Sequence, residues 1–143
     1  MKFEKSLEER AWFIFAKYIK LRDTDQYGYG KCIDTGRRIL YRIVDGKIQS
    51  TCDAGHYISR AVKTIMFNEV NVNAQYSAAN RSQIFTDYHT RIENKWGKQS
   101  VEWLRQKERE WGNKADSLDD DYLRWVIKHY SDKVEVLLKD KMF

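Results

Sequence analysis

His56 has polar neighbours in the sequence that suit acid–base chemistry on a phosphodiester. Asp53 precedes it closely, and the amides of Asn71 and Asn80 follow further along the chain. Hydrolysis of a phosphodiester needs a base that activates water and a cation that stabilises the developing charge. A histidine is a common general base near neutral pH, and a few oxygen ligands can hold one hard cation such as Mg²⁺. A lone histidine is more often structural, so these neighbours are what single out His56.

The elements that must position these side chains are a hairpin and the segment after it. We predict the hairpin over residues 37–52, because its first arm is rich in Ile, Leu, Tyr and Val and Asp45-Gly46 is a two-residue turn signal. Asp53 then lies in the segment that leaves the second arm. Residues 53–80 have few periodic signals and several asparagines, so we expect irregular structure with short helices there.

Helices are predicted on both sides of this region. Ser6 and Glu9 fit a capping box that opens a helix, and the glycines of residues 26–30 should end it. Helical spacing returns over residues 84–92, and Gly97 should close that helix. Further helices are expected to begin at three later serines: Ser100, Ser117 and Ser131.

The chain is predicted to form one α+β domain over residues 1–143. Within it we expect an N-terminal helix in residues 1–30, a core with the hairpin in residues 31–97, and a C-terminal helical region in residues 98–143. A chain of 143 residues can bury a core of its own without covalent staples. The five tryptophans are expected to build that core, because stacking on bases would need exposure.

Composition narrows the class of protein. A formal net charge of +5 and a pI near 9.1 weakly favour a polyanionic partner. Cys32 and Cys52 are too few for a disulfide framework. No secretory signal is recognisable and no apolar run approaches the length of a membrane span. We therefore expect a cytoplasmic protein with no membrane partner.

Blocks of this sequence resemble the NinG/Rap family of phage recombination nucleases. Residues 12–32 resemble the N-terminal block of that family, and residues 53–60, DAGHYISR, resemble its DAGHY-x-SR block. Residues 67–75, FNEVNVNAQ, resemble its FNE-x-N-V-H-x-Q block, and residues 88–104 fit its closing helices. The blocks occur in the family's order along the chain. If the gene belongs to a phage or prophage, the location would be the cytoplasm of the host cell.

The resemblance implies a ββα-metal (HNH-like) core and a metal-dependent endonuclease that acts on branched or recombination-intermediate DNA. By correspondence, His56 is the general base, and Asn71 is the middle asparagine that ties the loop and orients the histidine. Asn80 is the metal ligand on a helix, as in the related phage endonuclease VII class of resolvases. Asp53 is a candidate second ligand, since Gly55 stands where many such sites have the acidic one. The implied cation is one Mg²⁺ or Mn²⁺ per site, held by Asp53, His56 and Asn80.

The chain departs from the family at its zinc cysteines. Thr35, Tyr76 and Ala79 stand where the family has cysteine, and only Cys32 remains. A closed tetrahedral zinc site needs four ligands, so we expect no structural zinc. The retained histidine and helix asparagine favour an active endonuclease. The lost cysteines leave open a non-catalytic DNA-binding HNH relative that recognises DNA structure, or a partner-binding helical protein with a relic site.

Basic side chains before, within and after the hairpin are candidates for phosphate contacts. Such contacts position DNA without reading its bases, which suits DNA that is branched or has single-stranded segments. A solvated charged face is an equally good interpretation of the same residues, and a homodimer is left open. The candidates for DNA binding are Arg37, Arg38, Arg42, Arg60, Lys63 and Arg81.

Overall fold

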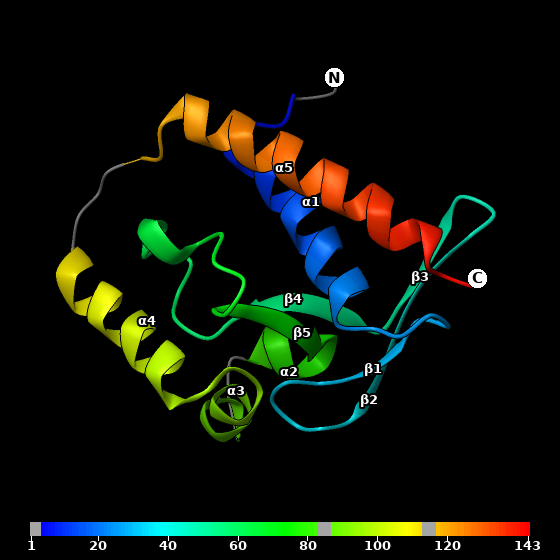
Figure 1. Ribbon diagram of the computed structural model, residues 1–143, viewed down its shortest axis with the longest axis horizontal. Helices are drawn as coiled ribbons and strands as arrows, with labels where there is room; N and C mark the ends of the chain where they lie inside the picture. The colour runs from blue at the N-terminus through cyan, green and yellow to red at the C-terminus, as the bar shows by residue number, and fades with distance from the viewer. Residues whose placement is uncertain (1–3, 83–86, 113–116) are drawn as a thin grey trace.

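Helices and two small antiparallel sheets make up a mixed α+β fold, as predicted (Figure 1). The computed structural model describes residues 4–82, 87–112 and 117–143. Its helices are α1 (Leu7–Arg22), the short 3-10 helix η1 (Lys63–Ile65), α2 (Ser77–Ser82), α3 (Tyr88–Trp96), α4 (Lys98–Trp111) and α5 (Asp120–Lys139). Its strands are β1 (Tyr29–Lys31), β2 (Arg38–Val44), β3 (Lys47–Ser50), β4 (Cys52–His56) and β5 (Val72–Tyr76).

Helix α1 begins at the predicted capping box and packs along α5. The Ser6 hydroxyl accepts a hydrogen bond from the backbone N–H of Glu9 at 3.1 Å, which satisfies a free donor of the first turn. Figure 1 shows α1 and α5 side by side above the sheets. Phe15 and Tyr18 of α1 pack on Tyr130 of α5, with ring centroids 4.8 and 4.9 Å apart. The main core therefore joins the two ends of the chain.

The predicted hairpin is confirmed as β2 and β3. Asp45 and Gly46 have φ values of 52° and 74°, the left-handed conformations that a two-residue turn of this kind requires. The sequence did not indicate β1, whose Tyr29 pairs with Leu40 of β2. Helix α1 ends at Arg22, before the glycines, as predicted, and the chain then returns along β2 through β1.

The prediction of irregular structure over residues 53–80 is wrong at two places, because β4 and β5 pair there. Ala54 lies opposite Ala74, and His56 lies opposite Val72. Both faces of this pair are largely covered, with α1 against one face and α2 against the other. A strand that is covered on both sides shows no alternation of apolar and polar residues. The sequence of β4 and β5 therefore contains no recognisable strand pattern.

The later helices form, but the expected starting serines do not begin them. Helix α4 follows Gly97, whose φ is 93°, and starts before Ser100. Asp119, not Ser117, caps α5 by accepting hydrogen bonds from two backbone N–H groups of the first turn. Helix α5 runs through Ser131 without a break. Residues 84–86, part of the expected helix over residues 84–92, lie outside the described residues.

The tryptophans contribute to the core only in part, because Trp12, Trp96 and Trp111 pack against its edges. None of the five is among the buried residues, and Trp103 and Trp125 are 46% and 53% exposed. The core consists mainly of aliphatic residues, tyrosines and phenylalanines, in one cluster between α1, α5 and the sheets and a second around α3 and α4. In the part of the chain that the structure describes, no helix is long and apolar enough to cross a membrane.

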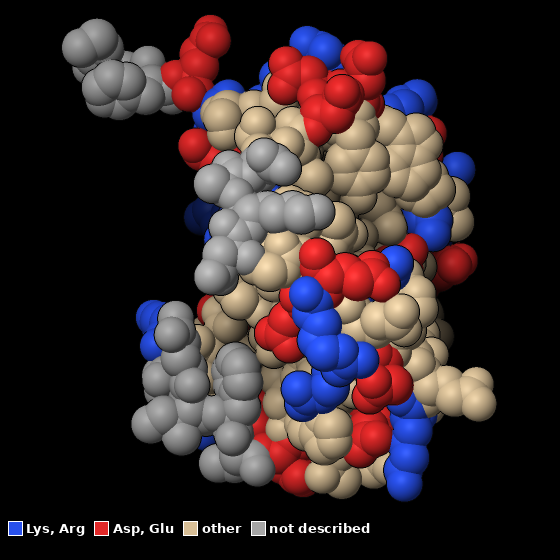
Figure 2. Space-filling model, turned by 90° about the vertical axis from the view of Figure 1, so that its left-hand side faces the viewer, with Lys and Arg blue, Asp and Glu red and all other residues tan. Residues whose placement is uncertain are grey.

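Charges of both signs are mixed on one face of the molecule. Figure 2 shows this face, which is the left-hand side of Figure 1, with Lys and Arg lying among Asp and Glu. On α4, Lys107 pairs with Glu110 at 3.1 Å and Arg109 pairs with Glu102 at 2.9 Å. This face is not a uniformly basic surface.

Candidate functional site

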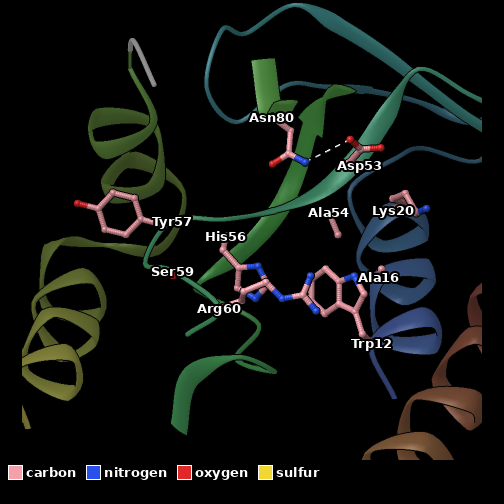
Figure 3. Close-up of a pocket in the computed structure, with 10 residues that line it drawn as sticks. All are labelled: Trp12, Ala16, Lys20, Asp53, Ala54, His56, Tyr57, Ser59, Arg60 and Asn80. Atoms are coloured by element: carbon pink, nitrogen blue, oxygen red, sulfur yellow. Dashed lines mark hydrogen bonds between the residues drawn. The ribbon is translucent and has the colours of Figure 1, made fainter. Parts of the chain in front are cut away.

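A cavity of about 650 Å³ opens beside the β4–β5 pair, between α1 and α2 (Figure 3). Trp12, Ala16 and Lys20 line it from α1, where a spacing of four residues places them on one face of the helix. The other lining residues come from β4, the loop after it and α2: Asp53, Ala54, His56, Tyr57, Ser59, Arg60 and Asn80. Four of the predicted site residues thus share one cavity.

His56 is fixed at the end of β4 by two contacts. Its Nε2 lies 3.0 Å from the carbonyl oxygen of Met66. A carbonyl can only accept, so Nε2 carries the proton and Nδ1 of the neutral ring keeps its lone pair. The ring of Trp12 stacks on the imidazole at a centroid distance of 4.7 Å. The histidine is therefore held in one orientation and one tautomer.

The pKa of His56 is lowered from 6.5 to about 4, and burial is the largest cause. The positive charges of Arg60 and Lys63 lower it further, while the hydrogen bond to Met66 acts in the opposite direction. The ring is neutral at pH 7 and can accept a proton on Nδ1. A phosphate in the cavity would raise this pKa towards neutrality, because an anion favours the protonated ring.

Asn71 lies outside the cavity and ties together the backbone around His56. It is fully buried, and its side chain bonds both the N–H and the C=O of Ile58, at 2.8 and 3.0 Å. A third bond, at 3.2 Å, runs to the carbonyl of Ile65, the residue before Met66. Asn71 therefore couples the loop after His56 to the segment that supplies the partner of its Nε2.

Asp53 and Asn80 meet on the opposite face of the β4–β5 pair from His56. The Asn80 Nδ2 donates to Asp53 Oδ2 at 3.2 Å, and the Ser77 hydroxyl donates to Oδ1 at 3.0 Å. Figure 3 shows Asp53 and Asn80 on one side of β4 and His56 with Trp12 on the other. Of the three expected metal ligands, Asp53 and Asn80 contact each other. Among the described residues, no hydrogen bond joins His56 to either of them.

The donor chemistry of Asp53 and Asn80 fits a hard divalent cation. A carboxylate offers about four acceptor positions, so the two hydrogen bonds on Asp53 leave room for a metal, and the amide oxygen of Asn80 is a ligand of the same hard kind. Among the described residues, no three His, Cys, Asp or Glu side chains are grouped so that they could hold a metal ion. A cation here would need further ligands or water.

At the positions of the expected zinc cysteines, hydrogen bonds and packing hold the chain. The Cys32 sulfur accepts from the backbone N–H of Tyr76 at 3.2 Å and of Thr35 at 3.4 Å. The guanidinium of Arg37 lies over the Tyr76 ring, 4.2 Å from its centroid. Cys52 is buried elsewhere, against the carbonyl of Leu40, and burial raises the pKa of its thiol. The single thiol of Cys32 therefore bonds both its own loop and the end of β5.

Arg60 and Arg81 flank the site on its two sides. Arg60 lines the cavity with its guanidinium over Trp12, 5.2 Å from the ring, and Arg81 lines a smaller hollow on the other side of Asp53. Lys63 is already paired, since its ammonium lies 3.0 Å from a carboxylate oxygen of Glu8. Its charge is therefore less available to an outside anion.

Arg37, Arg38 and Arg42 form a second basic group on and next to β2. Arg38 and Arg42 both lie over the ring of Tyr29, at 3.8 and 4.7 Å, and Arg37 lies over Tyr76 as described above. An aromatic platform holds a guanidinium while leaving its edge free to bond phosphate. Arg38 and Arg42 therefore share one platform and Arg37 has another, and none of the three lines the cavity.

The sequence did not assign Trp12 or Lys20 of α1 to the wall of a cavity with His56. Their signal was the four-residue spacing along α1, but that spacing also describes an ordinary core face. Only the fold shows that this stretch of α1 faces His56. Lys20 is largely buried there, and burial lowers the pKa of its ammonium.

Comparison with known proteins gave one family match. The model of the family described as bacteriophage lambda NinG protein matches residues 1–140. No curated protein and no solved structure matched the chain.

Proposed function

The chain belongs to the family described as bacteriophage lambda NinG protein, and on that premise we propose that it is a metal-dependent endonuclease. Its substrate is branched or recombination-intermediate DNA, in which it hydrolyses phosphodiester bonds. Membership alone indicates a phage recombination-related protein. The observation that carries the finer proposal is the cavity in which a neutral His56 of fixed tautomer shares the walls with the paired Asp53 and Asn80.

The chemistry assigned to this chain's residues is general-base catalysis. His56 Nδ1 takes a proton from the attacking water, while the bond from Nε2 to Met66 keeps the ring aligned. Asp53 and Asn80 would hold Mg²⁺ or Mn²⁺, and the cation would supply stabilisation of the negative charge that develops on phosphate oxygens. One lone pair cannot bind a metal and accept a proton at once, so the geometry favours the base role of His56 over its ligand role.

Arg60 and the β2 group give the same proposal a route for binding DNA. Arg60 stands at the cavity, where it can bond a phosphate beside the reacting one. Arg37, Arg38 and Arg42 can bond phosphates away from the cavity. Contacts of this kind recognise the path of the DNA phosphate backbone. That path differs between branched DNA and a straight duplex.

The runner-up is a non-catalytic DNA-binding relative. The observation in its favour is the absence, among the described residues, of any three His, Cys, Asp or Glu side chains grouped for a metal. In that case the arginines would bind DNA while the cavity did no chemistry.

A cleavage assay on a labelled four-way junction with Mg²⁺ or Mn²⁺ distinguishes the endonuclease from the non-catalytic DNA-binding relative. We expect the wild-type protein to cut and His56→Ala to cut slower by about 10²–10⁴-fold, as is typical when a general base is lost. The mutant should bind the junction nearly as well, because His56 contributes little to phosphate affinity.

The matched control is His129→Ala, which removes a histidine that stacks on Trp125 of α5. It should cut at the wild-type rate. Cleavage by His56→Ala at that rate would remove His56 from the mechanism. A wild-type protein that binds the junction and never cuts it would support the non-catalytic relative.

A further inference from the structure

Gln75 on β5 is a buried amide with nothing to bond. It is 0% exposed, and neither its Oε1 nor its Nε2 has a hydrogen-bond partner among the described residues. A buried polar group left unpaired destabilises the folded protein, because it gives up its hydrogen bonds to water. Such a group therefore needs an explanation, and an unseen ligand is one of the few that fit.

The Gln75 amide crosses over Gly55, next to Asn80. A Cβ built on Gly55 would lie 2.0 Å from Gln75 Oε1 and 3.1 Å from Asn80 Oδ1. The two amide oxygens are thus no further apart than the sum of these distances, so one cation or one water could contact both after a small adjustment. Position 55 must be glycine because Gln75 fills the space above it.

Gln75 also faces the carboxylate of the proposed site. It is the register partner of Asp53 across the β4–β5 pair, so the two side chains project from the same face. Asp53 bonds Asn80 on that face. Three oxygen-bearing side chains from β4, β5 and α2 therefore gather at one place.

Resting on the proposed function, we propose that Gln75 is a protein ligand of the catalytic cation and completes an all-oxygen set with Asp53 and Asn80. Rotation of the Gln75 amide about its last side-chain bond would turn Oε1, the ligand atom, towards the cation. Three neutral or anionic oxygens with water suit Mg²⁺ and Mn²⁺. This set leaves Nδ1 of His56, on the other face of β4, free to act as the base.

The test measures binding of Mn²⁺ alone to the full chain, by titration calorimetry and by the rise in melting temperature that the metal produces. Gln75→Leu should weaken Mn²⁺ binding at least tenfold and reduce that rise. Gln75→Glu should tighten binding, because a carboxylate adds charge to the set. Without metal, Gln75→Leu should melt no lower than wild type, since an apolar side chain of similar size replaces an unpaired amide.

Gln106→Leu is the control, because it removes an amide from the exposed surface of α4; it should bind Mn²⁺ like wild type. Unchanged Mn²⁺ affinity in both Gln75 variants would overturn the role of Gln75 and leave the proposed function standing. If Gln75→Leu did not fold, Gln75→Glu would decide alone by the same criterion. A wild-type chain that binds neither Mn²⁺ nor Mg²⁺ would defeat the metal-dependent function and this inference together.

Discussion

The orientation and the protonation state of His56 are set by residues that do not bond its Nδ1. Trp12 covers the ring, and the backbone carbonyl of Met66 accepts a hydrogen bond from Nε2. Asn71 holds the backbone next to both the histidine and this partner. Burial in this surrounding is what lowers the pKa of the imidazole to about 4. The free energy of unfolding should therefore depend on pH through His56.

The first prediction concerns stability against pH. The pKa of His56 is about 4 in the folded protein and 6.5 when unperturbed, so the unfolded chain takes up the proton first as the pH falls. Stability is full above pH 6.5 and declines towards pH 4, by on the order of 2–3 kcal/mol from this group. In urea unfolding between pH 7 and pH 4.5, His56→Gln should lose less stability than wild type.

His129→Gln serves as the control for that comparison, because His129 lies on α5 away from the cavity. It should follow the wild-type curve. If the His56→Gln curve ran parallel to wild type over the whole range, burial would not be holding the imidazole neutral.

Residue types and the family resemblance singled out part of the candidate site. His56, Asp53 and Asn80 could be chosen because their types and order suit one-metal hydrolysis, and the structure places all three around one cavity. Gln75 could not be chosen, because its position depends on the pairing of β4 with β5. That pairing left no pattern in the sequence.

At the scale of elements, Glu69 joins α1 to α5. Its carboxylate accepts from the hydroxyls of Tyr18 at 2.6 Å and Tyr130 at 3.1 Å, and from the ammonium of Lys133 at 3.3 Å. Burial alone would raise the pKa of Glu69, but these partners outweigh it and the pKa lies below its usual value. One carboxylate thus bonds side chains from both helices.

We expect Glu69→Ala to lower the free energy of unfolding by about 2–4 kcal/mol, because two tyrosine hydroxyls and a lysine lose their common partner. Urea denaturation measures this directly. Glu102→Ala breaks an exposed pair with Arg109 and should cost less than about 1 kcal/mol. Equal losses in the two variants would show that Glu69 does not hold the helices together.

Elements with local signals were the ones that the sequence predicted well. The capping box at Ser6 and the turn at Asp45-Gly46 depend on the conformations of a few adjacent residues, so they are legible in the chain. Strands β4 and β5 consist largely of Asn, Asp, Gly, Gln and Ala, which are poor strand formers. Packing between α1 and α2 stabilises these segments as strands. Such packing cannot be inferred from the residues of the strands alone.

For the whole molecule, we expect folding without zinc. Packing and hydrogen bonds hold the positions of Thr35, Tyr76 and Cys32, and a closed zinc site would need four ligands. Chelator should therefore stop cleavage while barely moving the melting temperature. Stoichiometric zinc by elemental analysis, together with unfolding by chelator, would contradict this.

Binding of DNA should depend strongly on salt and weakly on sequence. Each phosphate contact adds roughly 0.7–0.9 to the slope of log affinity against log salt. Arg38→Ala should flatten the slope by about that amount, whereas Lys63→Ala should flatten it less because Glu8 already pairs with Lys63. Fluorescence anisotropy of a labelled junction at several salt concentrations measures the slope.

Arg109→Ala is the control for charge alone, since Arg109 pairs with Glu102 on α4; its slope should match wild type. An equal effect of Arg38→Ala and Arg109→Ala would mean that net charge, not the β2 group, binds the DNA.

The pairing of α1 with α5 has a consequence for how the molecule is made. Helix α5 follows every other described element in the chain, and it adds the last cover to α1, which also packs against β4 and β5. Lys141, beyond α5, then bonds the carbonyls of Leu21, Thr24 and Asp25 at the end of α1. Because Phe15 packs edge-on against Tyr130 of α5, we expect the cover of α1, the helix that also carries Trp12, to be complete only when α5 has been made.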